Sequence, residues 1–449
     1  MHKILQNSGW LLIDKLARLF LGLFTMAMIA RHFGPEEFGI WNYSIALTAI
    51  VGGMAILGLD KIVVKELVSA PERRNEIVST ALLMRLAGGL VSCAICIMIT
   101  WFTRQNNPLY IWCTTITAFN ILLQSFDVFD YYYQSHNQVQ RVIIPKVAVF
   151  VLFCLIKMIC VRMNLSFMII LWVSLAELVI TYLLIFIYYV YHEGIASLCK
   201  ARLQEARYLF SQSWSLLFTG VLVLLYMKSD QLMLDILTTP RQLGEYAAAA
   251  RISELWYAIP TVIAVAMLPN LIQKRQTNHS RYLENVEKWI RLSMWGSTLI
   301  AIIVTIGSGW LTGIMYGSQY PHAGIILSIH IWANIPVFIC VAIMQYQIVE
   351  GNYNANLYAT IAGIAANLAI NLLLIPSLGG IAAAIATVVS YITVGTCLVL
   401  VDKTGQSKMF IIKMLHPGKA LADIWQLHLA LRSSIENLLS VIRQKSLSK

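Results

Sequence analysis

Charged residues are scarce in this sequence. Of its 449 residues only 12% are Asp, Glu, Lys or Arg, whereas 58% are hydrophobic. Soluble domains carry roughly 25% charged residues, so this chain lacks the polar surface that a soluble protein of its length requires. An unfolded chain is excluded as well, because disordered sequences combine low hydrophobicity with high charge. The composition therefore indicates an integral membrane protein.

Metal-binding and redox patterns are also missing. The chain has eight cysteines and nine histidines, but no pair of histidines has the spacing of metal ligands. Cys93 and Cys96 have the spacing of a redox or zinc pair, yet no second pair or nearby histidine completes it. We interpret the cysteines as packing residues, and we expect neither a metal site nor a cofactor.

Long apolar runs, in contrast, are frequent. A membrane-spanning helix needs about 20 apolar residues to cross a hydrocarbon core of about 30 Å. The connections are too short to hold a catalytic domain outside the membrane. The first run contains Asp14, Lys15 and Arg18, so we do not expect it to be a cleaved signal peptide. Twelve runs are long enough to span, near residues 10–30, 40–60, 78–102, 109–130, 142–161, 165–190, 209–235, 245–268, 289–314, 323–349, 354–376 and 380–401.

Polar and proline residues inside the runs have structural interpretations. Pro260 and Pro336 remove backbone hydrogen bonds, so we expect a kink at each. Asn367 and Asn371 lie four residues apart in one run, and we expect them to join helices rather than to contact a ligand. The tyrosines at 131–133 are typical of an interfacial aromatic belt.

Basic residues are distributed unevenly over the connections. With twelve spans, both termini and the connections after each even-numbered run lie on one side of the membrane, and these segments hold 21 of the 33 Lys and Arg residues. The opposite side holds four: Arg31, Arg104, Arg162 and Arg241. Because cytoplasmic connections carry the excess of Lys and Arg, both termini are predicted to be cytoplasmic. The net charge of +11 thus needs no nucleic-acid partner.

A weak repeat relates the two halves of the chain. Pro35 and Gly39 lie between the first two runs, and Pro240 and Gly244 lie between the seventh and eighth, 205 residues further on. The offset is six runs, an even number, so the two halves have the same orientation in the membrane. Transporters place such parallel repeats around an axis along the membrane normal. The alternative is that Pro and Gly only mark two turns.

After about residue 402 the pattern changes. Apolar residues recur at steps of three and four from Leu421 to Ile442, with Arg432, Glu436 and Arg443 between them. This pattern predicts a basic amphipathic helix on the inner leaflet, and a solvated coiled coil is the alternative. We assign residues 403–449 to a cytoplasmic tail.

Eight basic residues remain inside the runs, and they have a high energetic cost. A charge at the centre of a spanning helix costs roughly 2.5–3.5 kcal/mol. Lys146 and Arg291 lie near helix ends, so we expect them to extend to the interface. Deeper bases must face a water-filled cavity or partner groups, and they outnumber the deep acids. A cationic pocket favours an anion, and guanidinium groups suit phosphate oxygens. The deeper bases are Arg18, Arg85, Lys157, Lys228 and Arg251.

Acidic residues in or near the runs are candidates for ion coupling. Asp14 with Arg18, and Arg251 with Glu254, are spaced to share helix faces, so a structural ion pair is the alternative for each. Asp127 and Asp130 also share a face and fit either a cation site or a solvated helix end. Coupling to a proton or to sodium stays open. The candidates are Asp60, Asp127, Asp130, Asp230 and Glu254.

Several short motifs, in this order, resemble the O-antigen flippases (Wzx type) of the MOP superfamily, which also contains the MATE drug exporters. The resemblance covers about residues 5–402. Its motifs are Arg31-His32-Phe33-Gly34-Pro35 with Phe38-Gly39, Gly58-Leu59-Asp60, Ser229-Asp230, Leu243-Gly244-Glu245-Tyr246, Met267-Leu268-Pro269, Met315-Tyr316-Gly317-x-x-Tyr320, Asn367-x-x-x-Asn371-x-x-x-Ile375-Pro376, Gly379-Gly380 and the alanine-rich run to Ser390-Tyr391.

The resemblance implies an all-α membrane fold of two six-helix bundles around a central, often cationic, cavity. We place the bundles at residues 1–200 and 201–402. The implied substrate is an undecaprenyl-pyrophosphate-linked oligosaccharide, moved to the periplasmic leaflet of the bacterial inner membrane. A polysaccharide polymerase and chain-length machinery are the implied partners. Our candidates for substrate binding, taken from the charge argument, are Arg18, Arg85, Lys228 and Arg251.

Three other functions remain as alternatives. A drug or cation antiporter needs a deep acidic site, whereas the deep charges here are mainly basic. A membrane polymerase or glycosyltransferase commonly carries a large periplasmic loop, and here the outer connections are minimal. A scaffold without transport activity does not account for five deep bases. The identity of the glycan is not encoded in any local motif.

Overall fold

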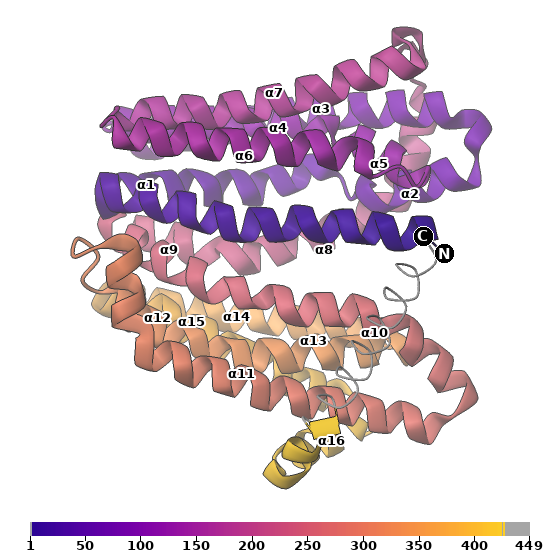
Figure 1. Cartoon of the computed structure of the whole chain (residues 1–449), viewed down its shortest axis with the longest axis vertical. Helices are drawn as coiled ribbons and strands as arrows, with labels where there is room; N and C mark the ends of the chain where they lie inside the picture. The colour runs from indigo at the N-terminus through magenta and orange to yellow at the C-terminus, as the bar shows by residue number, and fades with distance from the viewer. Residues whose placement is uncertain (1, 424, 427–449) are drawn as a thin grey trace, which may run out of the picture. The chain divides into compact units, whose positions relative to one another are not determined.

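The chain is helical throughout the part that the structure describes. This structure is a computed structural model, and it describes residues 2–423, 425 and 426, with side chains from residue 18 onwards. Within these residues all regular elements are helices and no strand is present (Figure 1). The all-α prediction is therefore confirmed.

Eleven helical segments of the described residues are long and apolar enough to cross a membrane. Ten coincide one to one with the third to twelfth predicted runs. The eleventh, Arg18–Ser69, contains the first two runs. It includes most of α1 (His2–Ile56), which is interrupted at Gly34, where φ is 85° and ψ is 173°. Such a backbone conformation favours glycine, and Pro35 directly after it begins the second helical segment.

The remaining elements follow one another with short connections. Their bounds are α2 (Leu59–Ser69), η1 (Pro71–Arg73), α3 (Arg74–Arg104), α4 (Pro108–Leu123), η2 (Gln124–Asp127), α5 (Val128–Ser135), α6 (Gln140–Arg162), α7 (Phe167–Glu193), η3 (Ile195–Cys199), α8 (Leu203–Leu237), α9 (Pro240–Glu254), η4 (Leu255–Tyr257), α10 (Ala258–Thr277), α11 (His279–Tyr316), α12 (Ala323–His330), η5 (Ile331–Ala333), α13 (Asn334–Val349), α14 (Tyr353–Leu378), α15 (Gly380–Val401) and α16 (Gln406–Met414).

Packing divides the chain into two compact units. Unit 1 comprises Met1–Ile252, Ser308–Leu327 and Asn367–Ala386, and unit 2 comprises Ser253–Gly307, Ser328–Ala366 and Thr387–Lys449. Unit 1 thus combines the first half of the sequence with segments of the second. The boundaries predicted from the repeat, at residues 200 and 402, stay a prediction, because this division follows packing and not the repeat.

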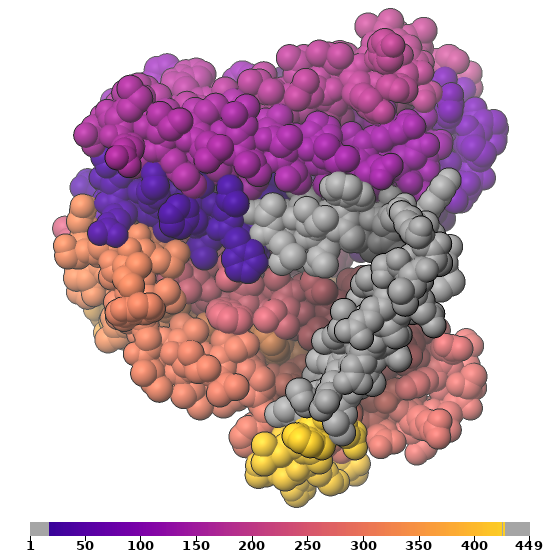
Figure 2. Space-filling model, viewed as in Figure 1, coloured from indigo at the N-terminus to yellow at the C-terminus, as the bar shows by residue number. Residues whose placement is uncertain are grey.

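Unit 1 is built around α1. The helices α3, α4, α6 and α8 pack against it, and α6 packs against α7. In Figure 2 the atoms of α6 and α7, in magenta, cover one face of this unit. Tyr132 and Tyr133 are buried in its core beside Tyr189, so the predicted aromatic belt is wrong at these two residues. Their rings pack between α5 and α7 because those helices meet there.

The two predicted kinks coincide with interruptions of the α-helix. In the eighth run η4 ends three residues before Pro260, and in the tenth run η5 ends three residues before Pro336. Tighter 3₁₀ turns at these positions are consistent with the hydrogen bonds that proline removes. Both prolines therefore divide their spans into two helical segments.

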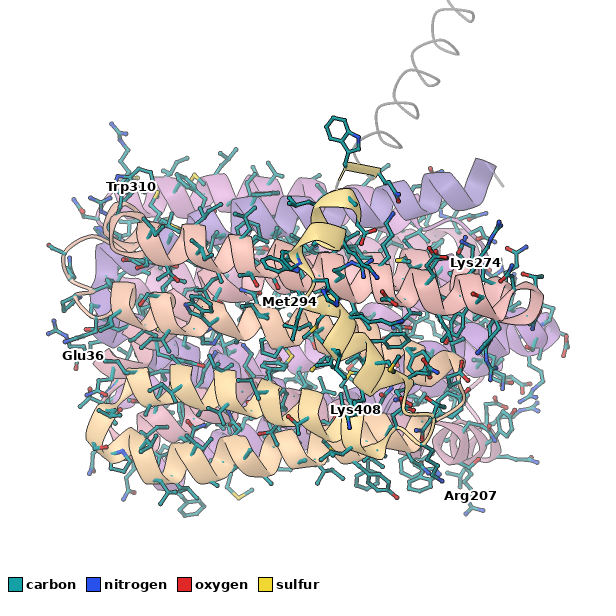
Figure 3. The ribbon with its side chains drawn as sticks, turned by 90° about the horizontal axis from the view of Figure 1, so that it is seen from below. Glu36, Arg207, Lys274, Met294, Trp310 and Lys408 are labelled. Carbon is teal, nitrogen blue, oxygen red and sulfur yellow. The ribbon has the colours of Figure 1, made fainter. Side chains whose placement is uncertain are left out.

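Figure 3 marks residues near the helix ends. In unit 1, Glu36 and Arg207 lie at opposite ends of the helices (Figure 3). In unit 2, Lys408 of α16 follows the end of α15 at Val401 by seven residues. We call this end of unit 2 the tail side, because α15 leads there directly into α16. The tail helix predicted from residue 421 falls mostly outside the described residues.

Candidate functional site

Two predicted bases of unit 1 lie at similar depths on neighbouring helices. Lys228 lies nine residues before the end of α8, and Arg251 lies eleven residues after the start of α9. At 1.5 Å per residue both are about 15 Å from the turn that joins these helices. If that turn lies at the surface of a hydrocarbon core about 30 Å thick, this distance corresponds to the middle of the membrane. Both bases are half-buried.

Arg251 contacts the second segment of α1. Its Nη2 donates to Oδ1 of Asn42 at 3.1 Å, and its guanidinium carbon lies 5.5 Å from the ring centre of Phe38. Asn42 is oriented in turn by its Nδ2, which donates to the carbonyl oxygen of Phe38 at 2.7 Å. These two contacts hold the arginine against α1. A guanidinium group can bind phosphate oxygens through two parallel hydrogen bonds.

A layer of polar side chains joins α8, α9 and α14 close to these bases. The Tyr246 hydroxyl donates to the buried carboxylate of Asp230. Ser229 donates to Oδ1 of Asn367 at 3.1 Å, and Asn371 donates to the same oxygen at 3.0 Å. Asn367 therefore joins α14 to α8, as predicted, whereas Asn371 donates to it from within α14. Asp230, a predicted coupling residue, lies two residues from Lys228 within this layer.

Arg85 lies in a separate buried network inside unit 1. Its Nη1 donates to the Tyr131 hydroxyl at 2.6 Å, and its Nη2 lies 3.8 Å from Asp127. Lys146 of α6 contacts Asp127 at 3.3 Å and also pairs with Asp130. The expectation that Lys146 extends to the interface is wrong, because these two carboxylates hold its amine inside the bundle. The cation that Asp127 and Asp130 bind here is thus a residue of the chain itself.

The other predicted site residues lie apart from one another. Arg18 is exposed, and its guanidinium lies 5.1 Å from the ring centre of Phe150. Asp60 is half-buried and lines a pocket of about 340 Å³ between the end of α1 and α8. Glu254 is half-buried at the end of α9. Arg85 and Arg251 have different partners on different helices, so the structure does not bring all four predicted bases into one cluster.

Lys157, the remaining deep base, forms a buried ion pair. Its amine donates to Oε2 of Glu177 at 2.6 Å, between α6 and α7. Both side chains are about nine-tenths buried. This agrees with the expectation that a deep base faces a cavity or partner groups, and here the partner is a carboxylate. Lys157 therefore has a structural role within unit 1.

Two polar clusters of unit 1 were not predicted. Asp235 is fully buried, and it accepts hydrogen bonds from Arg104 and from Tyr110, each at 2.5 Å. At the start of α9, the buried Glu245 accepts from His322 Nδ1 at 2.8 Å. In both clusters the partners are distant in the sequence, so spacing gave no signal for them.

No group of three or more His, Cys, Asp or Glu side chains among the described residues could hold a metal ion. All eight cysteines lie in that part of the chain, and all are free thiols. Cys93 and Cys96 are buried in α3. They pack as ordinary apolar residues of that helix.

Comparisons with known proteins agree with this architecture. A family model described as "Polysaccharide biosynthesis protein" matches residues 4–274, more than half of the chain. A protein named "Probable low-salt glycan biosynthesis flippase Agl15", from Haloferax volcanii, is 27% identical over 199 residues. That match covers 43% of this chain and 42% of the relative, so it spans less than half of either protein.

Two solved structures share the fold over most of both chains. The lipid II flippase MurJ, in an inward closed conformation, has a TM-score of 0.69 at 15% identity, with 94% of this chain and 92% of that chain covered. An inward-facing multidrug resistance MATE family transporter of the MOP superfamily has a TM-score of 0.66 at 11% identity, with 89% and 95% covered. At such low identities these similarities concern the fold alone.

Proposed function

Because the chain belongs to the polysaccharide biosynthesis protein family, we propose that it is a flippase for lipid-linked glycans. Its substrate in this proposal is an undecaprenyl-pyrophosphate-linked oligosaccharide of O-antigen or a related surface polysaccharide. The chain moves this substrate from the cytoplasmic to the periplasmic leaflet of the bacterial inner membrane, with both of its own termini in the cytoplasm. Similarity to a Haloferax protein named as a probable glycan biosynthesis flippase, and to the fold of the lipid II flippase MurJ, supports this proposal.

The observation that carries the proposal is the depth of Lys228 and Arg251. A charge near the middle of the membrane has a cost of roughly 2.5–3.5 kcal/mol on insertion scales, and ionisable residues at that depth commonly mark substrate or ion pathways. A diphosphate is the most highly charged part of the proposed substrate and the most costly part to move through hydrocarbon. Bases at mid-depth on α8 and α9 lower that cost where it is greatest.

Alternating access is the mechanism that we propose. The turns at Gly34 and at 238–239 lie on the outer side by the charge count. Near them Arg31 donates to the carbonyl oxygen of Ile314 at 2.8 Å, and Tyr320 donates to that of Ala30 at 2.8 Å. These contacts join the first half of the sequence to the second within unit 1. In this mechanism they form when the site is closed to the outside and break when it opens outward.

The driving force in this proposal has two sources. An inside-negative potential favours outward movement of an anion by about 2.3 kcal/mol per charge per 100 mV. Release of the substrate then requires that the bases be neutralised or withdrawn, and protonation or sodium binding at an acid such as Asp230 serves that step. Asp60, Asp127, Asp130 and Glu254 are the other candidates from the sequence.

Deletion of the gene, followed by complementation, tests the proposal. Without transport, complete repeat units remain attached to the lipid carrier on the cytoplasmic leaflet. Arg251→Ala is expected to restore surface polysaccharide at least tenfold less well than the native chain. Arg251→Lys is expected to be intermediate, because lysine keeps the positive charge but lacks the two parallel N–H donors of the guanidinium group. Lys65→Ala, at an exposed lysine near a helix end, is the control.

Three results contradict the proposal. Full activity of a normally inserted Arg251→Ala/Lys228→Ala protein excludes the two bases as a diphosphate site. Failure to assemble the repeat unit in the deletion strain indicates an enzyme. An unchanged polysaccharide together with greater sensitivity to cationic drugs indicates an exporter of the MATE kind.

A further inference from the structure

An apolar groove runs along unit 2 between α13 and α15. Its volume is about 470 Å³, and its lining includes Trp332, Ile339, Ile392, Gly395, Leu400 and Ile411. Gly395 has no side chain, and this absence widens the space beside Cys340. Trp332 is 39% exposed, Ile392 52% and Leu400 79%. These exposed apolar side chains lie on two spanning helices, so lipid tails and not water surround them. Lipid tails are as apolar as leucine, and this exposure therefore has no hydrophobic cost.

The groove has the length of one leaflet. Its lining on α15 runs from Val388 to Leu400, which corresponds to about 18 Å at 1.5 Å per residue. Half of a hydrocarbon core is about 15 Å thick. Since α15 ends at Val401 on the tail side, the groove begins near the middle of the membrane and ends at the tail-side interface. It therefore follows the path of an acyl chain in that leaflet.

Helix α16 closes the tail-side end of the groove and supplies positive charge there. Ile411 of α16 lines the groove, and Lys408 lies three residues earlier, on the same side of the helix. Lys403 and Lys408 are exposed, and among the described residues no carboxylate lies within 4 Å of either amine. Figure 2 shows α16, in yellow, at the surface. The amines thus stand where the headgroup of a lipid in the groove would lie.

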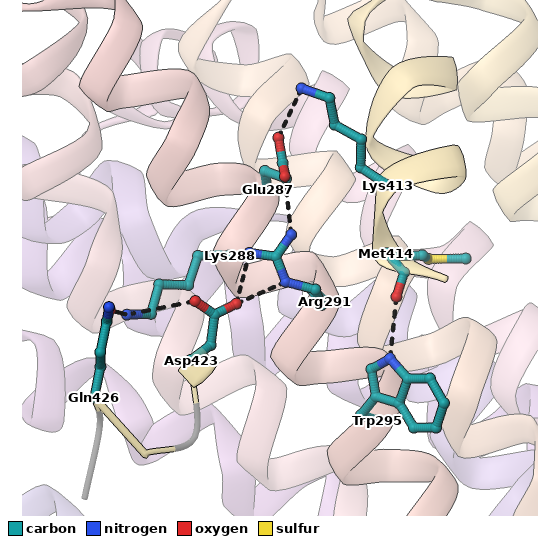
Figure 4. A network of polar contacts seen from close by, with 8 residues as sticks. All are labelled: Glu287, Lys288, Arg291, Trp295, Lys413, Met414, Asp423 and Gln426. Carbon is teal, nitrogen blue, oxygen red and sulfur yellow. Dashed lines mark hydrogen bonds and ion pairs between the residues drawn. The ribbon is translucent and has the colours of Figure 1, made fainter. Parts of the chain in front are cut away.

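A network of polar contacts fixes α16 in this position (Figure 4). Lys413 contacts Glu287 of α11 at 2.9 Å, and the Trp295 indole donates to the carbonyl oxygen of Met414 at 3.1 Å. Further along the tail, Asp423 accepts from Arg291 at 2.6 Å. The predicted extension of Arg291 to the interface is wrong, because Glu287 and Asp423 hold it buried. These contacts therefore hold α16 at the end of the groove.

We infer that this groove is a binding site for an anionic phospholipid of the tail-side leaflet. One acyl chain lies between α13 and α15, and the phosphate headgroup meets Lys403 and Lys408. Basic pockets at the ends of spanning helices recognise anionic headgroups in this way. The occupant is a bilayer lipid and not the transported glycan, because the lining is mostly apolar and the hydroxyl of Thr396 already donates to the carbonyl oxygen of Ile392 at 2.9 Å. The inference does not depend on the proposed function.

Native mass spectrometry of the delipidated full-length protein tests this site. Phosphatidylglycerol is expected to bind as a single retained adduct, and phosphatidylcholine is not. Lys403→Gln/Lys408→Gln is expected to weaken phosphatidylglycerol binding roughly 10- to 30-fold, the effect of removing two lysines that face an anionic headgroup. Lys61→Gln/Lys65→Gln, two lysines of unit 1, is the matched control and is expected to bind as the native chain does.

The acyl chain is tested separately by filling the groove. Thr396→Trp and Gly395→Leu each place a large side chain in it and are expected to abolish the adduct. Gly307→Leu, on α11 in open space, is the matched control and also reports folding. Equal binding in groove-filled and control proteins overturns the site. Equal retention of both phospholipids overturns headgroup recognition, and preferential retention of a polyprenyl phosphate identifies a carrier lipid as the occupant instead.

Discussion

Gly39 and Gly244 form a reciprocal contact with the two repeat prolines. A Cβ on Gly39 would lie 1.8 Å from the carbonyl oxygen of Pro240, and a Cβ on Gly244 would lie 1.9 Å from that of Pro35. The two Pro-x-x-x-Gly segments therefore pack against each other, each glycine under the other segment's proline. Self-complementary contacts of this kind arise when two equivalent segments are related by a two-fold axis. This relationship agrees with the duplication predicted from the sequence.

Substitution of either glycine is expected to destabilise unit 1. Because the neighbouring atoms belong to the backbone, Gly39→Ala and Gly244→Ala must separate the two helices. Overpacking of this kind costs about 1–3 kcal/mol. The two variants are expected to lower the thermal unfolding temperature of the purified protein by similar amounts.

A glycine without close neighbours is the control for this pair. Gly220 lies in α8 with nothing near its missing side chain, so Gly220→Ala is expected to be neutral or to stabilise by up to about 1 kcal/mol. Equal behaviour of Gly39→Ala and Gly220→Ala contradicts the close contact. A large effect at Gly39 with none at Gly244 contradicts its reciprocity.

The sequence predicted the spans and the repeat because both depend on local signals. Apolar length marks each span, and Pro-x-x-x-Gly marks each repeat. Charge pairing depended instead on distant residues. The partners of Arg104 and Lys146 lie 131 and 16–19 residues away, on other helices, and nothing in the spacing identifies them. Consequently the depth of the bases was predictable and their contacts were not.

The Lys157–Glu177 pair offers a test of buried charge in unit 1. Removal of one partner, in Lys157→Met, leaves a buried carboxylate and is expected to cost about 3–5 kcal/mol. The double variant Lys157→Met/Glu177→Leu is expected to recover most of that loss, because two apolar residues replace both charges. Thermal unfolding in detergent measures both effects.

An exposed pair supplies the comparison for this prediction. Arg202 and Glu76 lie 3.2 Å apart, but the arginine is two-thirds exposed, so Arg202→Met is expected to change the free energy of unfolding by less than about 1 kcal/mol. If Lys157→Met/Glu177→Leu is no more stable than Lys157→Met, the loss in the single variant does not come from an unpaired Glu177 carboxylate, and the prediction is contradicted.

The tail is expected to detach when Asp423 is removed. Asp423 accepts from Nε of Arg291 and lies 3.8 Å from Lys288, so Asp423→Ala removes the charged contacts at the end of the described tail and leaves the bond from Lys288 to Gln426. Trypsin cleavage at the exposed Lys419 is expected to become at least tenfold faster, because cleavage requires local opening of the segment. Leu421→Ala, at an exposed residue, is the control, and equal cleavage rates in both variants contradict the proposed attachment.

Asp402 predicts how the start of α16 responds to pH. Its Oδ2 accepts from the Ser407 backbone at 2.7 Å, and its Oδ1 accepts from the Thr404 backbone at 3.0 Å. Burial alone raises the pKa of Asp402, but these hydrogen bonds outweigh burial and hold the pKa below its ordinary value. A carboxyl whose pKa is lowered on folding contributes stability above its unfolded pKa of about 3.9, and that stability is lost as the pH falls through the folded value.

Hydrogen exchange in residues 406–414 is therefore expected to be independent of pH above about 5, after correction for the intrinsic rate, and to accelerate only in strong acid. Asp402→Asn keeps only one of the two acceptor oxygens, so it is expected to exchange faster already at pH 7, by an amount that corresponds to about 1–2 kcal/mol for the lost hydrogen bond, and to lose the acid transition. A transition near neutral pH, or native protection in the asparagine variant, contradicts this role.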